Sequence, residues 1–418
     1  MTDLDRFVAE HGVRHLLFSF CDLFGVQRAK LVPASAAAAL GRVGAGFAGF
    51  AAWLDLTPAD ADVLAVPDLR SLVVLPWQRE VGWVATDLFL GDQPLEQSPR
   101  RVLQQQIARA AAMGLEPRSG VEAEFFLLDG EGEGIADPRD RQSKPCYDQL
   151  ALMRHYPLVS GLLEAMEEMG WGPYQADHED ANGQFELNWT FSDALTTADR
   201  HALFRVMAAS LAERQGLQVS FDPKPLADRT GNGCHLHCSL WNPEGANLFH
   251  DPQGAQGLST LAHQFLAGVL EHAPALCALT NPVASSYRRL GRSVTTSGAT
   301  WSPAWISYGG NNRTHMVRIP DDQRLEIRLP DGAANPYLLQ AAVLAAGLDG
   351  IERQLDPGPC SQANLHSDPP PWEGRGPLPE SLEEALNQFE DDGRLQAALG
   401  ESFSASYLKL MRSDQRDV

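Results

Sequence analysis

The sequence predicts an α+β protein built from two units. Segments with helical periodicity alternate with short runs rich in β-branched and aromatic residues, which favours antiparallel strands covered by outer helices. A polar stretch at 91–99 that contains two prolines separates a mostly β N-terminal part from the remainder. We therefore expect a small domain at residues 1–95 and a larger one at 96–418. With 418 residues, 44% of them hydrophobic, the chain is long enough to build both cores.

The N-terminal part is predicted to form a helix, a hairpin and two further strands. Gly25 ends the short turn between two β-rich runs, which is typical of a hairpin. The expected positions are 3–11 for the helix, 13–20 and 26–32 for the hairpin, and 72–75 and 81–90 for the other strands.

The larger part is predicted to alternate helices and strands. Ser98 is a suitable N-cap and Pro99 a suitable first helical residue, so a helix is expected at 99–113. Further helices are expected at 153–169, 197–215, 258–279, 336–349 and 378–390. Strands are expected between them at 121–128, 184–189, 233–240 and 323–329. Residues 130–143 and 369–377 are rich in polar residues, glycine or proline and are expected to form surface loops.

The charge balance excludes several classes of function. The chain has 33 basic and 54 acidic residues, a net charge of −21, so neither nucleic acid nor an anionic membrane is an expected partner. An anionic substrate would have to bind in a local basic pocket. No run approaches 18 apolar residues, and the N-terminus lacks the pattern of a signal peptide.

The six cysteines are scattered, which favours reduced thiols in a cytoplasmic protein. Cys234 and Cys238 lie four residues apart, with His235 and His237 between them. Strand geometry would place the cysteines and the histidines on opposite faces. A zinc site at this segment remains an alternative.

An arginine-rich strand is the strongest local signal. Polar and apolar residues alternate between residues 323 and 329, so Arg324, Glu326 and Arg328 share one face. In an ordinary half-buried strand this face would point to water. With Arg289, Arg313 and Arg318 upstream, however, five guanidinium groups surround one carboxylate. Guanidinium groups suit bidentate contact with phosphate or carboxylate, so the segment indicates an anionic ligand whose metal the acid holds.

Two pairs of glutamates point to the same chemistry. Glu122 and Glu124 stand two residues apart in an apolar run, and burying two like charges is costly unless a cation neutralises them. Glu179 and Glu186 flank an Asn-Gly turn and can approach a common point. The alternatives are an edge strand with solvated acids for the first pair and an exposed hairpin for the second.

The remaining candidates follow a glycine-rich loop. His235, His237 and Ser239 share one strand face after Gly231 and Gly233, which would let a ligand approach the backbone. Oxygen-rich ligation with at most one imidazole per ion suits Mg²⁺ or Mn²⁺ better than zinc. Metal ions beside arginines are typical of phosphoryl transfer. The chain contains no Walker loop, dinucleotide fingerprint or Ser/His/Asp arrangement.

Six ordered motifs resemble those of the glutamine synthetase family, and the resemblance covers nearly the whole chain. They lie at 121–127, 179–186, 231–237, 281–290, 312–320 and 324–331. More narrowly, the chain resembles the type III branch, which also contains γ-glutamylmethylamide synthetases.

The resemblance implies a β-grasp N-terminal domain and a catalytic domain with a curved antiparallel sheet and outer helices. It also implies a dodecamer of two hexameric rings with active sites between subunits, and two or more Mg²⁺ or Mn²⁺ ions per site. One ion would be held by Glu124, Glu179 and Glu186, and the other by Glu122, His235 and Glu326. Glutamate would be bound by Gly231, Arg289 and Arg328, and ATP by His237, Ser239, Arg313, Arg318 and Arg324. Arg313, Arg318 and Glu326 would be catalytic.

The implied reaction is an ADP-forming ligation. The γ-carboxylate of glutamate would attack the γ-phosphate of ATP, and ammonia or a small amine would then displace phosphate from the γ-glutamyl phosphate. The chain departs from the family at the nitrogen-donor pocket. An Asp-Gly-Ser-Ser segment of ammonia-using members is replaced by Gly46–Ala52, and a glutamate six residues after Arg289 is replaced by Thr295. The bacterial adenylylation tyrosine is also absent, because His366 follows Leu365.

Ammonium needs a carboxylate to desolvate it and take its proton, whereas Phe47, Phe50 and small residues suit an alkylamine. We therefore favour a methylamine-like substrate over ammonia, although Asp55 or Asp60 are candidates for the missing charge. A glutamine synthetase that uses ammonia is the main alternative. A non-catalytic structural or regulatory homologue and a guanidino-type phosphotransferase are the others.

Overall fold

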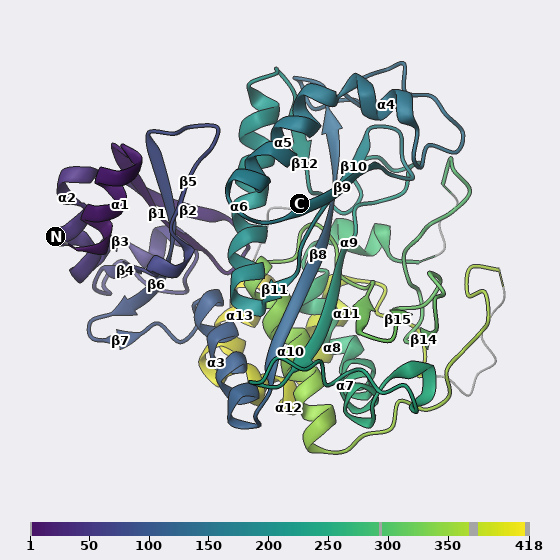
Figure 1. Cartoon of the computed structure of the whole chain (residues 1–418). Helices are drawn as coiled ribbons and strands as arrows, with labels where there is room; N and C mark the ends of the chain where they lie inside the picture. Colours follow the sequence, from purple (N-terminus) through teal and green to yellow (C-terminus); the bar gives the residue numbers. More distant parts are fainter. Residues whose placement is uncertain (1, 292–294, 368–374, 414–418) are drawn as a thin grey trace.

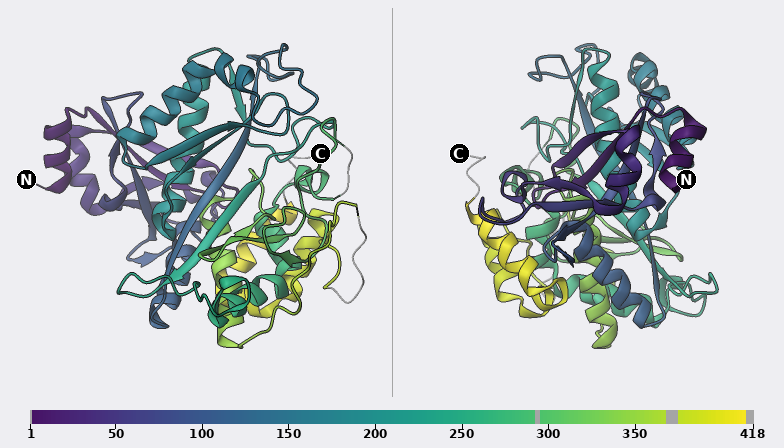
Figure 2. Two further views of the ribbon diagram at one scale, coloured as in Figure 1. Left: turned by 45° about the vertical axis from the view of Figure 1, so that its right-hand side comes forward. Right: turned by 90° about the vertical axis from the view of Figure 1, so that its left-hand side faces the viewer.

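The computed structural model describes residues 2–291, 295–367 and 375–413, and it contains two β-sheets with helices packed around them (Figure 1). The first sheet belongs to the N-terminal part, drawn in purple and dark blue, and the second runs through the rest of the chain. The two further views in Figure 2 show the N-terminal part to one side of the larger sheet. The predicted α+β class is confirmed.

The first sheet has seven strands in the order β2-β1-β6-β4-β3, with β5 and β7 also on β6. The predicted hairpin is present, because β1 (His15–Cys21) pairs antiparallel with β2 (Gln27–Pro33), while β1 lies parallel to β6 (Val81–Leu90). The other strands are β3 (Ala45–Phe47), β4 (Val63–Pro67), β5 (Val73–Val74) and β7 (Gln93–Pro94). The helical segments are α1 (Asp3–His11), α2 (Ala34–Val43), η1 (Gly49–Ala52) and η2 (Leu69–Ser71).

The second sheet has nine strands in the order β14-β15-β16-β13-β8-β10-β9. Its centre is the long strand β8 (Glu116–Leu128), which lies between β13 (Cys234–Trp241) and β10 (Gln184–Trp189). The shorter β11 and β12 also pair with β8. The remaining bounds are β9 (Pro173–His178), β11 (Ser192–Asp193), β12 (Gln218–Ser220), β14 (Tyr308–Gly309), β15 (Val317–Asp321) and β16 (Arg324–Ile327).

Helices cover the second sheet, and α10 (Pro336–Glu352) is buried along almost its whole length. The others are α3 (Pro99–Ala112), α4 (Gln149–Arg154), α5 (Tyr156–Glu168), α6 (Ala194–Glu213), η3 (Ala255–Gly257), α7 (Thr260–Glu271), α8 (Ala273–Thr280), α9 (Ala284–Arg289), α11 (Leu382–Asp391), α12 (Gly393–Leu399) and α13 (Glu401–Ser413). The single helices predicted at 153–169 and 258–279 are wrong. Each is two helices, because Pro157 and Pro274 lie in the first turn of a new helix and cannot continue the preceding one.

The two parts of the chain share a hydrophobic core and a buried ion-pair cluster. Trp83 and Ala85 of β6 pack in the same core as residues of β8, α3 and α6. Arg100 of α3 is buried and reaches Asp68 at 2.8 Å, Asp87 at 2.5 Å and Asp199 at 3.0 Å. Because this core crosses the predicted boundary between residues 95 and 96, the division into two domains remains a prediction.

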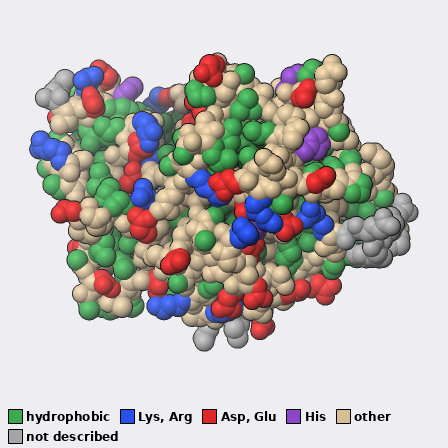
Figure 3. Space-filling view, turned by 90° about the horizontal axis from the view of Figure 1, so that it is seen from below, with side chains coloured by type: hydrophobic (Ala, Val, Ile, Leu, Met, Phe, Trp, Pro, Cys, Tyr) green, Lys and Arg blue, Asp and Glu red, His purple; other side chains and the backbone are tan. Residues whose placement is uncertain are grey.

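The surface and two predicted loops complete the description. Acidic, basic and hydrophobic side chains are interspersed over the face drawn in Figure 3. Within the described ranges, no helix has both the length and the apolar character needed to cross a lipid bilayer. The predicted loop at 130–143 contains no helix or strand, whereas that at 369–377 lies mostly outside the described residues.

Candidate active site

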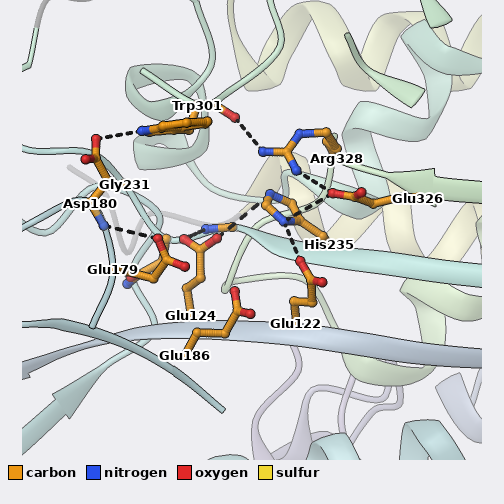
Figure 4. A network of polar contacts seen from close by, with 12 residues as sticks. Glu122, Glu124, Glu179, Asp180, Glu186, Gly231, His235, Trp301, Glu326 and Arg328 are labelled. Carbon is orange, nitrogen blue, oxygen red and sulfur yellow. Dashed lines mark hydrogen bonds and ion pairs between the residues drawn. The ribbon is translucent and has the colours of Figure 1, made fainter. Parts of the chain in front are cut away.

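Strand register brings acids from distant segments together on one face of the second sheet. Glu124 of β8 lies opposite Glu186 of β10, and Glu122 of β8 lies opposite His235 of β13. On the next strand, Glu326 of β16 lies opposite His237. Figure 4 shows the side chains of Glu122, Glu124, Glu186, His235 and Glu326 gathered in one region. The edge-strand alternative for β8 is therefore wrong, because strands pair with it on both sides.

The first acid group combines a predicted pair with a residue that the sequence analysis missed. Carboxylate oxygens of Asp177, Glu179 and Glu186 all lie within 4.8 Å of one another. Burial raises the pKa of Glu179 to about 8, and the nearby charge of Glu124 adds to this shift. Burial and the neighbouring acids also raise the pKa of Glu186 well above its usual value. The Asn-Gly turn beside these acids is buried, so the exposed-hairpin alternative is wrong.

The second group contains Glu122, Glu326 and a histidine. Ligand atoms of Glu122, His237 and Glu326 lie within 4.8 Å of one another. His235 is equally close, with Nδ1 3.1 Å from Glu122 Oε2 and 3.8 Å from Glu326 Oε1. Burial opposes ionisation of Glu122, but hydrogen bonds with both histidines hold its pKa well below the usual value. The expected ligand His235 and the expected ATP residue His237 thus both reach this group.

These donors fit divalent cations. Two clusters of buried and half-buried carboxylates, with imidazole only in the second, are the ligands that Mg²⁺ and Mn²⁺ accept. Burial and the neighbouring carboxylates raise the pKa of Glu179 and Glu186, so a bound cation would favour their ionised forms. The zinc alternative is wrong. Cys234 and Cys238 lie in the hydrophobic core, and the candidate cation groups among the described residues contain no cysteine.

The arginine-rich strand is buried on both faces except at Arg324, which is exposed. Leu325 and Ile327 are in the core, but Glu326 is also fully buried and Arg328 nearly so. The interpretation in which this polar face points to water is therefore wrong. Arg318 and Arg328 each donate a hydrogen bond to Glu326, with Arg318 Nη1 2.5 Å from Oε2. Both guanidinium groups thereby contact the same buried acid.

A cavity of about 140 Å³ lies between the acids and the arginines. Besides Glu122, Glu124, Glu179, Glu186 and His235, its lining includes Cys146, Tyr147, Asp177, Trp301, Arg313, Arg318 and Arg328. The exposed side chain of Arg313 therefore borders the same space as the buried ones. Arg324 lies at the margin, where its Nε is 3.0 Å from His237 Nδ1. Ser239 lies further along β13, and its hydroxyl accepts a hydrogen bond from Trp241 at 2.9 Å.

The glycine-rich loop packs directly against this centre. A Cβ at Gly231 would lie 2.1 Å from the carbonyl oxygen of Pro223. A Cβ at Gly233 would lie 2.7 Å from His235 Nε2 and 3.0 Å from both Glu124 Oε1 and Arg289 Nη2. The backbone N–H of Gly233 also donates to Glu124 Oε2 at 2.7 Å. Close approach of the backbone explains why these positions have no side chain.

The fully buried Arg289 lies beneath this loop. Its guanidinium donates to the carbonyl oxygens of Leu329, at 3.1 Å, and Arg328, at 3.3 Å, and burial lowers its pKa. Arg289 thus contacts the backbone of Arg328 and lies beside Gly231 and Gly233, and the binding of glutamate by these residues stays a prediction.

Around Thr295 the structure brings together further groups, among them Asp180 and Trp301, which the sequence analysis did not single out. Thr295 is buried, and its hydroxyl donates to the carbonyl oxygen of Ala299. Asp180, next to Glu179, accepts a hydrogen bond from the indole of Trp301 at 2.6 Å. The two acids considered as substitutes are engaged elsewhere within this chain, Asp55 with Lys409 at 2.6 Å and Asp60 with the backbone of Thr57 at 2.7 Å. Asp180 had no local signal, because its partner lies 121 residues away.

The acids, arginines and glycine-rich loop on this mixed sheet define a metal-dependent ligase. The family model described as "Glutamine synthetase, catalytic domain" matches residues 96–418. The chain therefore belongs to the glutamine synthetase family, whose members are carbon–nitrogen ligases that use ATP and a divalent metal.

The similar proteins include both glutamine synthetases and a glutamate–methylamine ligase by name. The chain is 51% identical over 409 residues to a glutamine synthetase of Rhizobium leguminosarum bv. phaseoli, covering 98% of this chain and 94% of the relative. It is 45% identical over 410 residues to a glutamate–methylamine ligase of Methyloversatilis universalis, covering 96% and 92%. A solved structure of GmaS with ADP has a TM-score of 0.96 and 54% identity, and the match covers 100% of this chain and 96% of that one. A ligand-free GmaS structure has a TM-score of 0.95 and 52% identity, with the same coverage.

Proposed function

We propose that the protein joins the γ-carboxyl group of L-glutamate to a small alkylamine, with methylamine as the preferred substrate and ATP as the source of energy. The main support for the proposal is the region in which the resemblance places the nitrogen substrate. Thr295 stands where the resemblance expects a glutamate, and its hydroxyl is already bonded to the backbone. The similarity to a glutamate–methylamine ligase and to GmaS structures supports the same substrate class.

The proposed roles of the acids and arginines follow from their charges. Glu124, Glu179 and Glu186 would hold one Mg²⁺ or Mn²⁺ ion, and Glu122, His235 and Glu326 another, with Asp177 and His237 close enough to contribute. When bound, these ions neutralise charge on the phosphates of ATP. Arg289 and Arg328, with the backbone at Gly231, would bind glutamate. Arg313, Arg318, Arg324, His237 and Ser239 would bind ATP.

The two chemical steps follow from this arrangement. The γ-carboxylate oxygen forms a bond to the γ-phosphorus of ATP while the bond to ADP breaks. The amine nitrogen then attacks the acyl carbon, phosphate leaves, and the proton lost by the amine must pass to a base. Arg313 and Arg318 are placed beside the cavity to stabilise the charge on the transferred phosphoryl group.

The assembly and the compartment are part of the same proposal. We expect a dodecamer of two hexameric rings in which a neighbouring subunit completes each site. All six cysteines are free thiols, which supports the expected cytoplasmic location.

Glutamine synthetase activity with ammonia is the second candidate. The 51% identity to a glutamine synthetase favours it, as do the carboxylates of Asp177 and Asp180 near the cavity.

Phosphate release should be measured with glutamate, ATP and either ammonium, methylamine, ethylamine or putrescine. We expect the highest kcat/KM with methylamine. Efficient turnover of ammonium with none of the alkylamines would reject the alkylamine proposal.

A further inference from the structure

Asp180 is a buried carboxylate that accepts hydrogen bonds from two distant segments of the chain. Its Oδ2 accepts hydrogen bonds from the indole Nε1 of Trp301 at 2.6 Å, from the hydroxyl of Thr230 at 3.1 Å and from the hydroxyl of Ser297. Its own backbone N–H donates to Glu179 Oε2 at 3.1 Å. Asp180 therefore connects the segment that carries Glu179 to the segment 295–301.

Trp301 spans the cavity between the acids and the arginines. Its indole bonds to Asp180, while its carbonyl oxygen accepts a hydrogen bond from Arg328 Nη2 at 3.3 Å. Figure 4 shows the indole across the cavity from Glu124 and Glu186. The backbone of Trp301 has a φ of 57°, a left-handed conformation that is unfavourable for a residue with a side chain. The bonds at both ends of Trp301 hold this strained conformation in place.

Further hydrogen bonds hold the segment 295–301 in place beside Asp180. The ammonium group of Lys144 donates to the carbonyl oxygen of Ser297, and the backbone N–H of Thr296 donates to the carbonyl oxygen of Asp228 at 2.9 Å. Cys146, two residues after Lys144, places its thiol 3.6 Å from Asp180 Oδ1 and 3.9 Å from Glu179 Oε2. The indole and the thiol thus both contact Asp180 and both line the cavity.

This combination of groups suits a small alkylammonium ion. Carboxylates attract the charged nitrogen, and an indole face attracts both the cation and its methyl group. Cys146 adds a small, polarizable surface beside the acids. A rigid wall of this kind admits a short alkyl chain and excludes a longer one, since one methylene group changes kcat/KM by about 10-fold to 200-fold.

We propose that Trp301 and Cys146 form the wall that selects the amine by size, and that Asp180 is the positioning residue that holds Trp301 there. This inference rests on the proposed alkylamine ligase activity and assigns the selection of its substrate to particular residues. Asp180 acts through Trp301 and need not touch the amine.

The test compares kcat/KM for ammonium, methylamine and ethylamine at saturating ATP and glutamate. Trp301→Ala should lower the preference for methylamine over ethylamine by about tenfold or more, with the KM values for ATP and glutamate changed by less than about threefold. Asp180→Ala should shift the preference in the same direction. Asp180→Asn, which keeps an acceptor oxygen for the indole, should restore most of it.

Two further variants keep the test interpretable. Trp301→Phe retains a ring but loses the bond to Asp180, so it should shift the preference in the same direction by a smaller factor. It carries the test if Trp301→Ala folds poorly. Trp171→Phe is the matched control, because Trp171 is a buried tryptophan that packs on Trp189 rather than lining this cavity. Trp171→Phe should leave the amine preference unchanged.

Equal losses for all three amines, or the same shift in Trp171→Phe, would overturn the inference and leave the proposed function standing. If the wild-type protein uses only ammonium, the proposed function fails by that result alone. In that case, Trp301→Ala should gain turnover of methylamine. The absence of a gain would reject the proposed role of Trp301 and Cys146 in selecting the amine.

Discussion

Arg318 Nη1 lies 2.5 Å from Glu326 Oε2, and this ion pair joins the neighbouring strands β15 and β16 at the wall of the cavity. Arg328 donates to the other carboxylate oxygen of Glu326. Both oxygens of a fully buried acid are therefore occupied by guanidinium groups that also face the cavity. Burial opposes ionisation of Glu326, but the charges of Arg328 and His235 lower its pKa, so this acid is ionised at neutral pH.

Replacing Glu326 should abolish catalysis. Glu326→Gln keeps the size of the side chain but removes the charge that pairs with Arg318 and Arg328 and would hold a metal ion. We expect ADP formation to fall by about 10³-fold or more and binding of Mn²⁺ to weaken. Coupled ADP release and titration calorimetry with Mn²⁺ would measure the two effects. Turnover at the wild-type rate would reject the metal assignment.

Adding a single methyl group at Gly233 should impair the site more than the fold. The new Cβ would lie 2.7 Å from His235 Nε2 and 3.0 Å from Glu124 Oε1, so these side chains must move. Misplacement of this size costs about 10-fold to 100-fold in kcat, so we expect such a loss in Gly233→Ala. Gly161→Ala is the control, because nothing lies within 4 Å of the added Cβ in α5. Full activity in Gly233→Ala would show that the loop is not closely packed there.

Divalent cations should stabilise the protein more at pH 8 than at pH 6. Burial and Glu124 raise the pKa of Glu179 from 4.5 to about 8. Without a cation, the folded state therefore keeps a proton that the unfolded state loses, and stability falls as the pH rises from about 4.5 to about 8. Because cations and protons compete for these carboxylates, the Tm increase with Mg²⁺ or Mn²⁺ should grow over the same range. Thermal melts with each ion and with EDTA would measure it. An increase that is equal at both pH values would contradict the acid-cluster interpretation.

His272 should also make stability fall as the pH rises, because it holds a proton more tightly in the folded state than in the unfolded state. Burial lowers its pKa, but hydrogen bonds with Asp392 at 2.5 Å and Asp349 at 3.0 Å outweigh burial and raise it. A raised pKa gives stability that is complete below the ordinary histidine value of about 6.5 and is lost as the pH rises through the folded value.

His272→Gln should therefore lower the Tm by about 2–4 °C at pH 6 and by less at pH 8. His263→Gln is the matched control on α7, since the ring nitrogens of His263 lie at hydrogen-bond distance from the carbonyl oxygen of Ser259 and the side-chain oxygen of Gln256 rather than from carboxylates. A uniform Tm decrease across this range would show that His272 contributes packing alone.

Much of the site was predictable because its chemistry is repeated locally. The period-2 pattern around Glu326 gave the strand and the shared face of Arg324 and Arg328, and the spacing of Glu122 and Glu124 gave a second strand face. The helix breaks at Pro157 and Pro274 also had a local signal, since proline favours the first turn of a new helix. The missed helix α2 begins in an alanine-rich run with high helix propensity.

The remaining features depend on contacts between distant segments. Alternation alone cannot show that Glu326 and Arg328 are buried, because that follows from the packing of the whole sheet. Asp177 joins the first acid group only through the pairing of β9 with β10. Asp180 and Trp301 come together across 121 residues, and no short-range pattern connects them.

The most direct test of the central claim is a competition between amines. Equimolar methylamine and ammonium should be supplied together with glutamate, ATP and Mg²⁺ or Mn²⁺, and the products separated by mass spectrometry. We predict that γ-glutamylmethylamide exceeds glutamine and that one ADP forms for each amide. Glutamine as the sole product would contradict the assignment of an alkylamine substrate, and ADP formation without any amide would contradict the ligase itself.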